Sequence, residues 1–281
     1  MSTAAKPLLI FSHANSFPAG TYTKLFGELQ RRSLQVQAIP QLGHDPRYPV
    51  TDNWPHLVQQ LLDFARPHIQ GHTGPVYWIG HSLGGFLSLM AAALQPQWAQ
   101  GVVLIDSPIV GGWRASLLGM SKRTALIGSL SPGAISRKRV QSWENEAAAL
   151  RHFQSKKAFA RWDPEVLVDY IRHGTHDEVT ARGTRRVLSF QRDIETRIYN
   201  TLPDHLDRLF KKHPLTCPVA FIGGRYSREM KQVGTALTEK VTQGRMLMLD
   251  GGHLVPMEKP IVTAAAIETA VLNLASLKPT R

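Results

Sequence analysis

Cysteine is nearly absent from this chain, with Cys217 the only one among 281 residues. A single thiol excludes an intrachain disulfide, a cysteine-rich zinc site and an iron–sulfur cluster. Cys217 precedes Pro218 at the start of an apolar run, so we expect a small buried residue rather than a reactive thiol. A reducing compartment is the simplest inference.

Long uninterrupted apolar stretches are also missing. The longest apolar tract, residues 75–94, contains His81, Ser82 and further glycines and serines, which disqualifies it as a membrane span. Residues 8–11 are apolar but far too few for a signal-peptide core. We therefore expect a cytoplasmic protein without a membrane span.

Nucleic-acid-binding signatures are absent although the formal net charge is +12. Residues 107–200 hold 16 Lys and Arg against 9 Asp and Glu, so they supply +7 of that excess. The basic clusters 137–139 and 182–186 could attract nucleic acid, anionic lipid or an anionic substrate, but no helix-turn-helix, RNP or zinc-finger pattern accompanies them. We expect solvated surface and no nucleic-acid partner, with an anionic substrate group as the alternative.

Metal-ligand patterns are weak as well. His173, His176 and Asp177 have a spacing that could hold a metal, but Gly174 intervenes and no second ligand cluster is evident. The sequence predicts neither a metal nor a cofactor.

What the chain does contain is a regular alternation of strand and helix patterns. The predicted strands cover residues 8–12, 34–39, 75–80, 101–106, 217–223 and 245–249, and the predicted helices cover 21–32, 53–70, 82–95, 229–240 and 259–277. Short apolar strands separated by helices predict an α/β fold, with a mostly parallel sheet of about six strands and helices on both faces.

The alternation stops after Pro108. From residue 109 to residue 200 the chain reads as several amphipathic helices rich in aromatic and basic residues. The sequence therefore predicts a core formed by residues 1–108 and 201–281, with residues 109–200 as an insertion.

One serine lies at a strand-to-helix turn. The segment Gly80-His81-Ser82-Leu83-Gly84 joins the predicted strand 75–80 to the predicted helix that follows. Flanking glycines allow the sharp turn, so the Ser82 hydroxyl projects above the sheet as a candidate nucleophile. The Leu83 amide lies at a helix N-terminus, where it could stabilise an oxyanion.

A serine nucleophile needs a base. His253 follows the last predicted strand in Asp250-Gly251-Gly252-His253, and loops at the carboxyl edge of an open sheet converge. His253 is thus the candidate base, although 171 positions separate it from Ser82. The backbone amide of Asn15, in the loop after the first strand, is the candidate second oxyanion donor.

These segments resemble the α/β-hydrolases, through Ser12-His13-Ala14-Asn15, the nucleophile elbow at residues 80–84 and Gly251-Gly252-His253. The resemblance covers nearly the whole length. It implies the α/β-hydrolase fold without its first two strands, and it implies that residues 109–200 are a helical lid.

The acid departs from the usual family pattern, because Ser227 occupies the place where an aspartate commonly follows the seventh strand. Asp106 and Glu229 compete for the role. A subset of the family resembles this chain in placing the acid after the sixth strand, and Asp106 follows Ser82 by 24 residues. The resemblance favours Asp106 over Glu229, with Ser227 as a supporting hydrogen-bond partner.

The expected reaction is hydrolysis of a small-molecule carboxylic ester or thioester through an acyl-enzyme on Ser82. Aromatic residues of the insertion would supply core or an acyl pocket: Trp113, Trp143, Phe153, Phe159, Trp162 and Tyr170. Two alternatives stay open. One is a hydrolase or acyltransferase for an anionic acyl substrate such as an acyl-CoA, and the other is a non-catalytic binding protein with the same fold.

Overall fold

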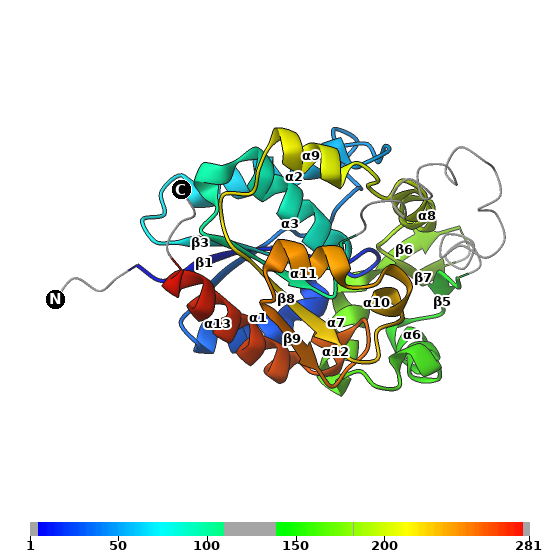
Figure 1. Cartoon of the computed structure of the whole chain (residues 1–281). Helices are drawn as coiled ribbons and strands as arrows, with labels where there is room; N and C mark the ends of the chain where they lie inside the picture. Colours follow the sequence, from blue (N-terminus) through cyan, green and yellow to red (C-terminus); the bar gives the residue numbers. More distant parts are fainter. Residues whose placement is uncertain (1–4, 110–138, 182, 278–281) are drawn as a thin grey trace.

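A parallel sheet forms the centre of the molecule (Figure 1). The computed structural model describes residues 5–109, 139–181 and 183–277. Within them, six strands pair in the order β2-β1-β3-β4-β8-β9, every pair parallel. Their bounds are β1 Leu8–Ser12, β2 Gln35–Ala38, β3 Val76–His81, β4 Gly101–Ile105, β8 Val219–Gly224 and β9 Met246–Leu249. The predicted fold class is confirmed.

Helices cover both faces of this sheet. One face packs against α1 (Thr23–Arg31) and α13 (Pro260–Ser276), and the other against α2 (Pro55–Ile69), α3 (Leu83–Leu94), α9 (Leu206–Lys212) and α11 (Ala236–Thr242). Side chains alternate between the two cores along each strand: Leu9 and Phe11 join the first, Leu8 and Ile10 the second. Burial on both faces explains why the strands read as continuous apolar runs.

Two predicted helices differ in detail. The segment 229–240 forms two helices, α10 (Arg228–Val233) and α11, because Gly234 adopts a φ of +80° and ends the first. The helix predicted from residue 21 begins as the 3-10 turn η1 (Ala19–Tyr22). Two further short elements are η2 (Pro96–Trp98) and α12 (Val255–Glu258).

The described part of the insertion is not helical throughout. It contains α6 (Glu146–Gln154), η4 (Lys157–Phe159), α7 (Pro164–Gly174) and α8 (Arg192–Asn200), together with β5 (Ser142–Trp143), β6 (Thr175–Thr180) and β7 (Gly183–Leu188). These strands form an antiparallel sheet in the order β5-β7-β6. The expectation of helices alone is wrong for residues 175–188, where β-branched residues favour strands and Gly183, at a φ of +107°, follows the hairpin turn.

Aromatic side chains hold the insertion on the sheet edge. Phe153, Trp162 and Tyr170 are buried, and their rings pack around Phe159. Phe17, in the loop after β1, joins the same cluster through Trp162 and Tyr170, each at 5.5 Å between ring centroids. Trp113 lies outside the described residues. The insertion is therefore anchored beside the loop that carries Asn15.

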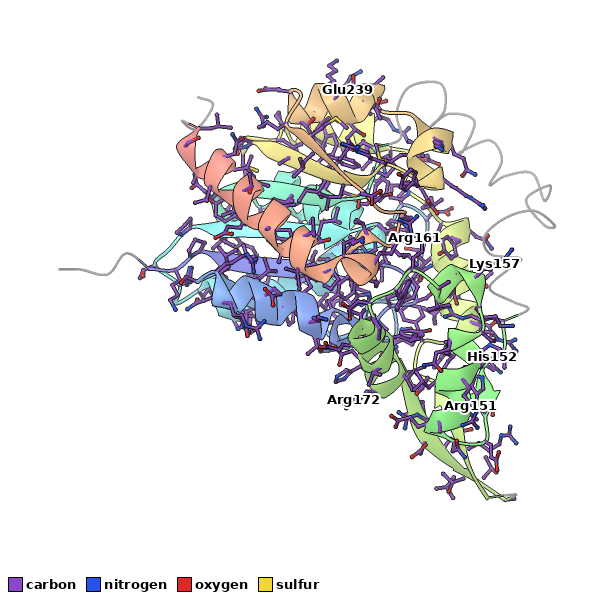
Figure 2. The ribbon with its side chains drawn as sticks, turned by 90° about the horizontal axis from the view of Figure 1, so that it is seen from below. Arg151, His152, Lys157, Arg161, Arg172 and Glu239 are labelled. Atoms are coloured by element: carbon purple, nitrogen blue, oxygen red, sulfur yellow. The ribbon has the colours of Figure 1, made fainter. Side chains whose placement is uncertain are left out.

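The basic clusters 137–139 and 182–186 are described only in part, because residues 137, 138 and 182 lie outside the described residues. Arg185 is exposed, as are Arg151, Lys157 and Arg172 elsewhere on the outside of the insertion (Figure 2). Arg186, however, is buried, and its guanidinium pairs with Asp177 and Glu146. The expectation of a solvated cluster is wrong for Arg186, because its guanidinium group reaches acceptors on the surrounding strands and helices.

Two simpler expectations concern single features. Cys217 is buried as predicted, and burial raises the pKa of its thiol to about 11, which disfavours the reactive thiolate. None of the helices in the described residues is both long enough and apolar enough to cross a bilayer.

Candidate active site

The turn between β3 and α3 holds Ser82 in a strained conformation, with φ 53° and ψ −116°. The chain can fold this way because the positions two residues before and two residues after Ser82 are glycines, Gly80 and Gly84. A Cβ at Gly80 would overlap the Gly84 carbonyl, and a Cβ at Gly84 would overlap the carbonyl of Ser12 in β1. The Ser107 hydroxyl further supports the turn by donating to the Ser82 carbonyl at 2.8 Å. Strain of this kind is typical of functional sites.

His253 lies in the loop between β9 and α12 and reaches Ser82 across the sheet edge. The Ser82 hydroxyl donates to His253 Nε2 at 3.0 Å, and His253 Nδ1 donates to Asp106 Oδ1 at 2.7 Å. Nε2 is thus an acceptor that can take the Ser82 proton, while Asp106 fixes the tautomer. The three residues come together from the ends of β3, β4 and β9 as the topology predicts.

Asp106 is fully buried, and its carboxylate accepts two further hydrogen bonds, one from the last residue of β8 and one from the loop that follows it. The Ser227 hydroxyl donates to Oδ1 at 2.6 Å, and the Gly224 amide donates to Oδ2 at 2.7 Å. A buried carboxylate is stable only when its oxygens are paired, and here both are. Ser227 therefore contacts the acid that it was expected to support, and the Gly224 amide is a partner that sequence reasoning missed.

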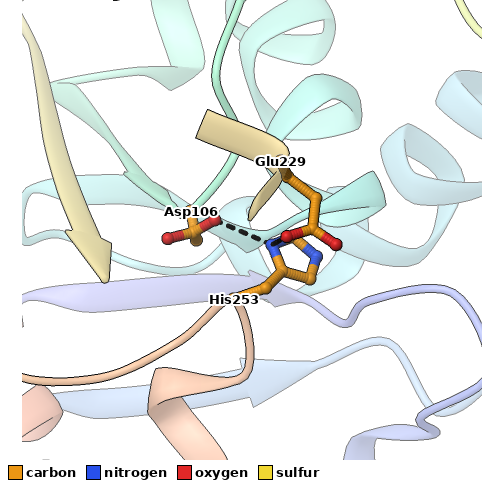
Figure 3. A group of neighbouring side chains, drawn as sticks. All are labelled: Asp106, Glu229 and His253. Atoms are coloured by element: carbon orange, nitrogen blue, oxygen red, sulfur yellow. Dashed lines mark hydrogen bonds and ion pairs between the residues drawn. The ribbon is translucent and has the colours of Figure 1, made fainter. Parts of the chain in front are cut away.

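Glu229 lies beside the same histidine but farther away. Its Oε2 is 3.7 Å from His253 Nδ1 and its side chain is 47% exposed, whereas Asp106 is closer and fully buried (Figure 3). Nδ1 carries one proton, which Asp106 accepts. The structure thus brings both competing carboxylates to the histidine and gives only Asp106 the hydrogen bond.

Charge around His253 favours its protonated form. Burial by itself would lower the pKa of His253, but the hydrogen bond to Asp106 and the charges of Glu229 and Asp106 together outweigh burial and raise it. The same three side chains are close enough to hold a cation among the described residues. Nδ1 lies 2.7 Å from Asp106 Oδ1, and a cation bound at Nδ1 would replace the proton that Asp106 accepts.

The candidate oxyanion amides lie on adjoining backbone. Leu83 is the first residue of α3, and the loop carrying Asn15 follows Ser12, the last residue of β1, whose carbonyl packs on Gly84. Neither amide donates to another described residue. Asn15 is buried, and its side-chain Nδ2 donates to the Glu195 carbonyl of α8 at 3.1 Å. The loop is thereby tied to the insertion, a contact that the sequence does not reveal.

A partly buried ion pair lies beside this contact, with the Arg139 side chain 20% and the Glu195 side chain 7% exposed. Arg139 pairs with Glu195 at 3.4 Å and donates to the Tyr170 hydroxyl at 2.5 Å. Arg139 was expected to be solvated. That expectation is wrong, because α8 and α7 supply buried acceptors for its guanidinium.

Comparisons with known proteins agree with this geometry. The sequence model of the alpha/beta hydrolase family matches residues 9–266. Monoglyceride lipase from Rattus norvegicus is 31% identical over 113 residues, which cover 39% of this chain and 37% of that protein. A homologue of the same lipase from Monkeypox virus is 25% identical over 171 residues, 56% of this chain and 62% of its own. The chain thus matches little more than a third of the rat lipase.

Solved structures share the fold over nearly the whole chain. The peroxisomal alpha-beta-hydrolase Lpx1 from Saccharomyces cerevisiae has a TM-score of 0.74 at 18% identity, covering 99% of this chain and 79% of that one. E-2-(acetamidomethylene)succinate hydrolase has a TM-score of 0.67 at 19% identity, covering 96% and 92%. With the family match over residues 9–266, these findings establish that the chain belongs to the alpha/beta hydrolase family.

Proposed function

We propose that this protein is a serine hydrolase that cleaves a small-molecule carboxylic ester or thioester through an acyl-enzyme on Ser82. The observation that carries the proposal is the continuous hydrogen-bond chain from the Ser82 hydroxyl through His253 to Asp106, with distances of 3.0 Å and 2.7 Å. Each group in that chain has the partner that its step requires.

The proposed reaction begins with attack of Ser82 Oγ on the acyl carbon. His253 Nε2 takes the hydroxyl proton and returns it to the leaving group, while Asp106 stabilises the imidazolium. The Asn15 and Leu83 amides stabilise the negative oxygen of the tetrahedral intermediate. Water then repeats the sequence, releasing the acid and restoring the Ser82 hydroxyl.

Covalent labelling tests this proposal directly. The wild-type protein is incubated with an alkyl fluorophosphonate and digested, and the modified peptide is identified by mass spectrometry. We expect labelling at Ser82 and hydrolysis of p-nitrophenyl esters by the same preparation. Folded protein that is neither labelled nor hydrolytic would favour the non-catalytic binding protein instead.

The anionic acyl substrate is the second candidate because exposed cations such as Arg151 and Lys157 lie on the outer surface of the insertion. Arg139 and Arg186 support it less, since Glu195, Asp177 and Glu146 already pair with them. An acyl-CoA and a neutral thioester of the same acyl chain distinguish the two candidates. Preference for the acyl-CoA that disappears at high salt would favour the anionic substrate. The cytoplasmic location stays a prediction.

A further inference from the structure

Tyr22 and His81 form a buried hydrogen-bond chain that the proposed reaction does not use. The Ala14 amide donates to the Tyr22 hydroxyl at 3.0 Å, and Tyr22 donates to His81 Nδ1 at 2.8 Å. His81 Nε2 then donates to the backbone carbonyl of His253 at 2.8 Å. The Tyr22 and His81 side chains are buried, with exposed fractions of 2% and 0%. The chain therefore joins the loop after β1 to the loop after β9.

The direction of every hydrogen bond in this chain is fixed. A carbonyl only accepts, so His81 Nε2 carries the proton and Nδ1 of the neutral ring accepts. Tyr22 must then give its one proton to Nδ1, which leaves its oxygen to accept from the Ala14 amide. Burial, with a smaller contribution from His253, lowers the pKa of His81 to about 3, so the ring stays neutral at ordinary pH.

The two ends of this hydrogen-bond chain lie next to groups that the proposed reaction brings to the acyl carbon of the substrate. Ala14 precedes Asn15, the proposed oxyanion donor, and the accepting carbonyl belongs to the proposed base. His81 itself precedes Ser82. Three segments that are far apart in sequence are thus connected by three hydrogen bonds, two of them buried and the third, to the His253 carbonyl, partly buried.

We infer that Tyr22 and His81 are positioning residues, which hold the Asn15 amide and the His253 loop in register with Ser82. This inference rests on the proposed function, because register matters only if Ser82 is the nucleophile. Displacement of a reacting group by about 1 Å is enough to lower a rate about 10²-fold. Neither residue needs to touch the substrate.

The Tyr22→Phe variant isolates the hydroxyl from the packing. The Tyr22 ring packs on Phe11 at 4.9 Å and on Phe26 at 6.0 Å between centroids, and phenylalanine keeps both contacts. With p-nitrophenyl butyrate as probe, we expect kcat to fall about 10- to 100-fold while KM stays within about twofold. Unchanged kcat in Tyr22→Phe would overturn the inference.

Tyr77→Phe is the matched control. Tyr77 is also buried, but in the described part of the chain its hydroxyl has no hydrogen-bond partner. We expect this variant to keep wild-type kcat and KM. An equal loss of kcat in both variants would assign the Tyr22 effect to the core in general and overturn the positioning role.

Substitutions at His81 separate the two arms of the chain. His81→Asn keeps an acceptor near Nδ1 for Tyr22, whereas His81→Gln keeps a donor near Nε2 for the His253 carbonyl. In His81→Gln the link to Tyr22 is already broken, so adding Tyr22→Phe should lower kcat less than about twofold further. A further 10-fold loss of kcat in the double variant would show that the two residues act independently, and it would overturn the inference that they act through one hydrogen-bond chain.

Fluorophosphonate labelling distinguishes failure of this inference from failure of the proposed function. An unlabelled wild-type protein would refute both. Wild-type labelling at Ser82 together with equally fast labelling of Tyr22→Phe would refute only the positioning role. We expect Ser82 to be labelled in both proteins, about 10-fold more slowly in Tyr22→Phe, with cooperative thermal unfolding retained.

Discussion

The carboxyl edge of the parallel sheet and the insertion beside it hold their polar groups in different ways. At the sheet edge, Asp106 is fully buried and accepts from His253, Ser227 and the Gly224 amide. In the insertion, aromatic rings form most of the core, side chains of β6 are mostly exposed, and the buried Arg186 pairs with Asp177 and Glu146, whose side chains are both more than half exposed. We propose that residues at the sheet edge carry out the chemistry and that the insertion covers the site and selects the substrate.

Ser82→Ala should have the largest effect on this comparison, because it removes the proposed nucleophile from the sheet edge. We expect kcat for p-nitrophenyl butyrate to fall about 10⁴- to 10⁶-fold, with the thermal midpoint nearly unchanged. Steady-state kinetics and calorimetry measure the two quantities. Activity near the wild-type level would place the reaction elsewhere in the molecule.

Asp106→Asn should rank next, since the amide oxygen replaces one acceptor but the negative charge is lost. We expect kcat to fall about 10³- to 10⁴-fold, because the histidine loses its tautomer control and the stabilisation of its charged form. The same kinetic assay measures the loss. A smaller loss than that of Glu229→Gln would transfer the orienting role to Glu229.

Phe153→Ala tests the insertion side of the comparison. Phe153 is 2% exposed within the aromatic cluster, so truncation should lower the free energy of unfolding by about 3–5 kcal/mol. We expect kcat to change less than about tenfold, with a higher KM for esters of longer acyl chains. Val179→Ala, at a residue 84% exposed in β6, is the control and should change neither quantity. A kcat loss equal to that of Asp106→Asn would contradict the division of roles.

Glu229→Gln should have the smallest effect on kcat, and the pH dependence of kcat/KM tests the contribution of Glu229 to the sheet edge. The base must be neutral, so kcat/KM falls as pH drops through the pKa of His253. Glu229 helps to raise that pKa, and its removal should therefore move the acid limb of kcat/KM to lower pH, with kcat within about threefold of wild type. Glu239→Gln, at an exposed residue of α11 (Figure 2) that does not contribute to the pKa shift of His253, should leave the limb in place.

The sequence predicted the positions of the core strands to within one or two residues, because apolar runs and glycine-marked turns are local signals. It did not predict the β6–β7 hairpin, whose strands carry few apolar residues and are mostly exposed. It also missed the break at Gly234, since the helical pattern continues on both sides. Local patterns therefore served best where burial on both faces constrained the composition.

Within the candidate site, Ser82 and His253 followed from short motifs and from the convergence of strand ends. For the acid, the resemblance to a subset of the family favoured Asp106 over Glu229, and the distances of the two carboxylates to Nδ1 agree with that preference. Tyr22 gave no signal at all. Its partner His81 is 59 positions away, and no short-range pattern reports a contact of that separation.

By itself the sequence determined the α/β architecture, the strained turn at Ser82 and the histidine that faces it, because backbone sterics and strand-to-helix alternation act over a few residues. Only the tertiary structure decided which carboxylate accepts the Nδ1 proton, where Arg139 is paired and how Tyr22 joins the loops. These outcomes depend on hydrogen bonds between residues that meet only after the sheet and its helices have packed.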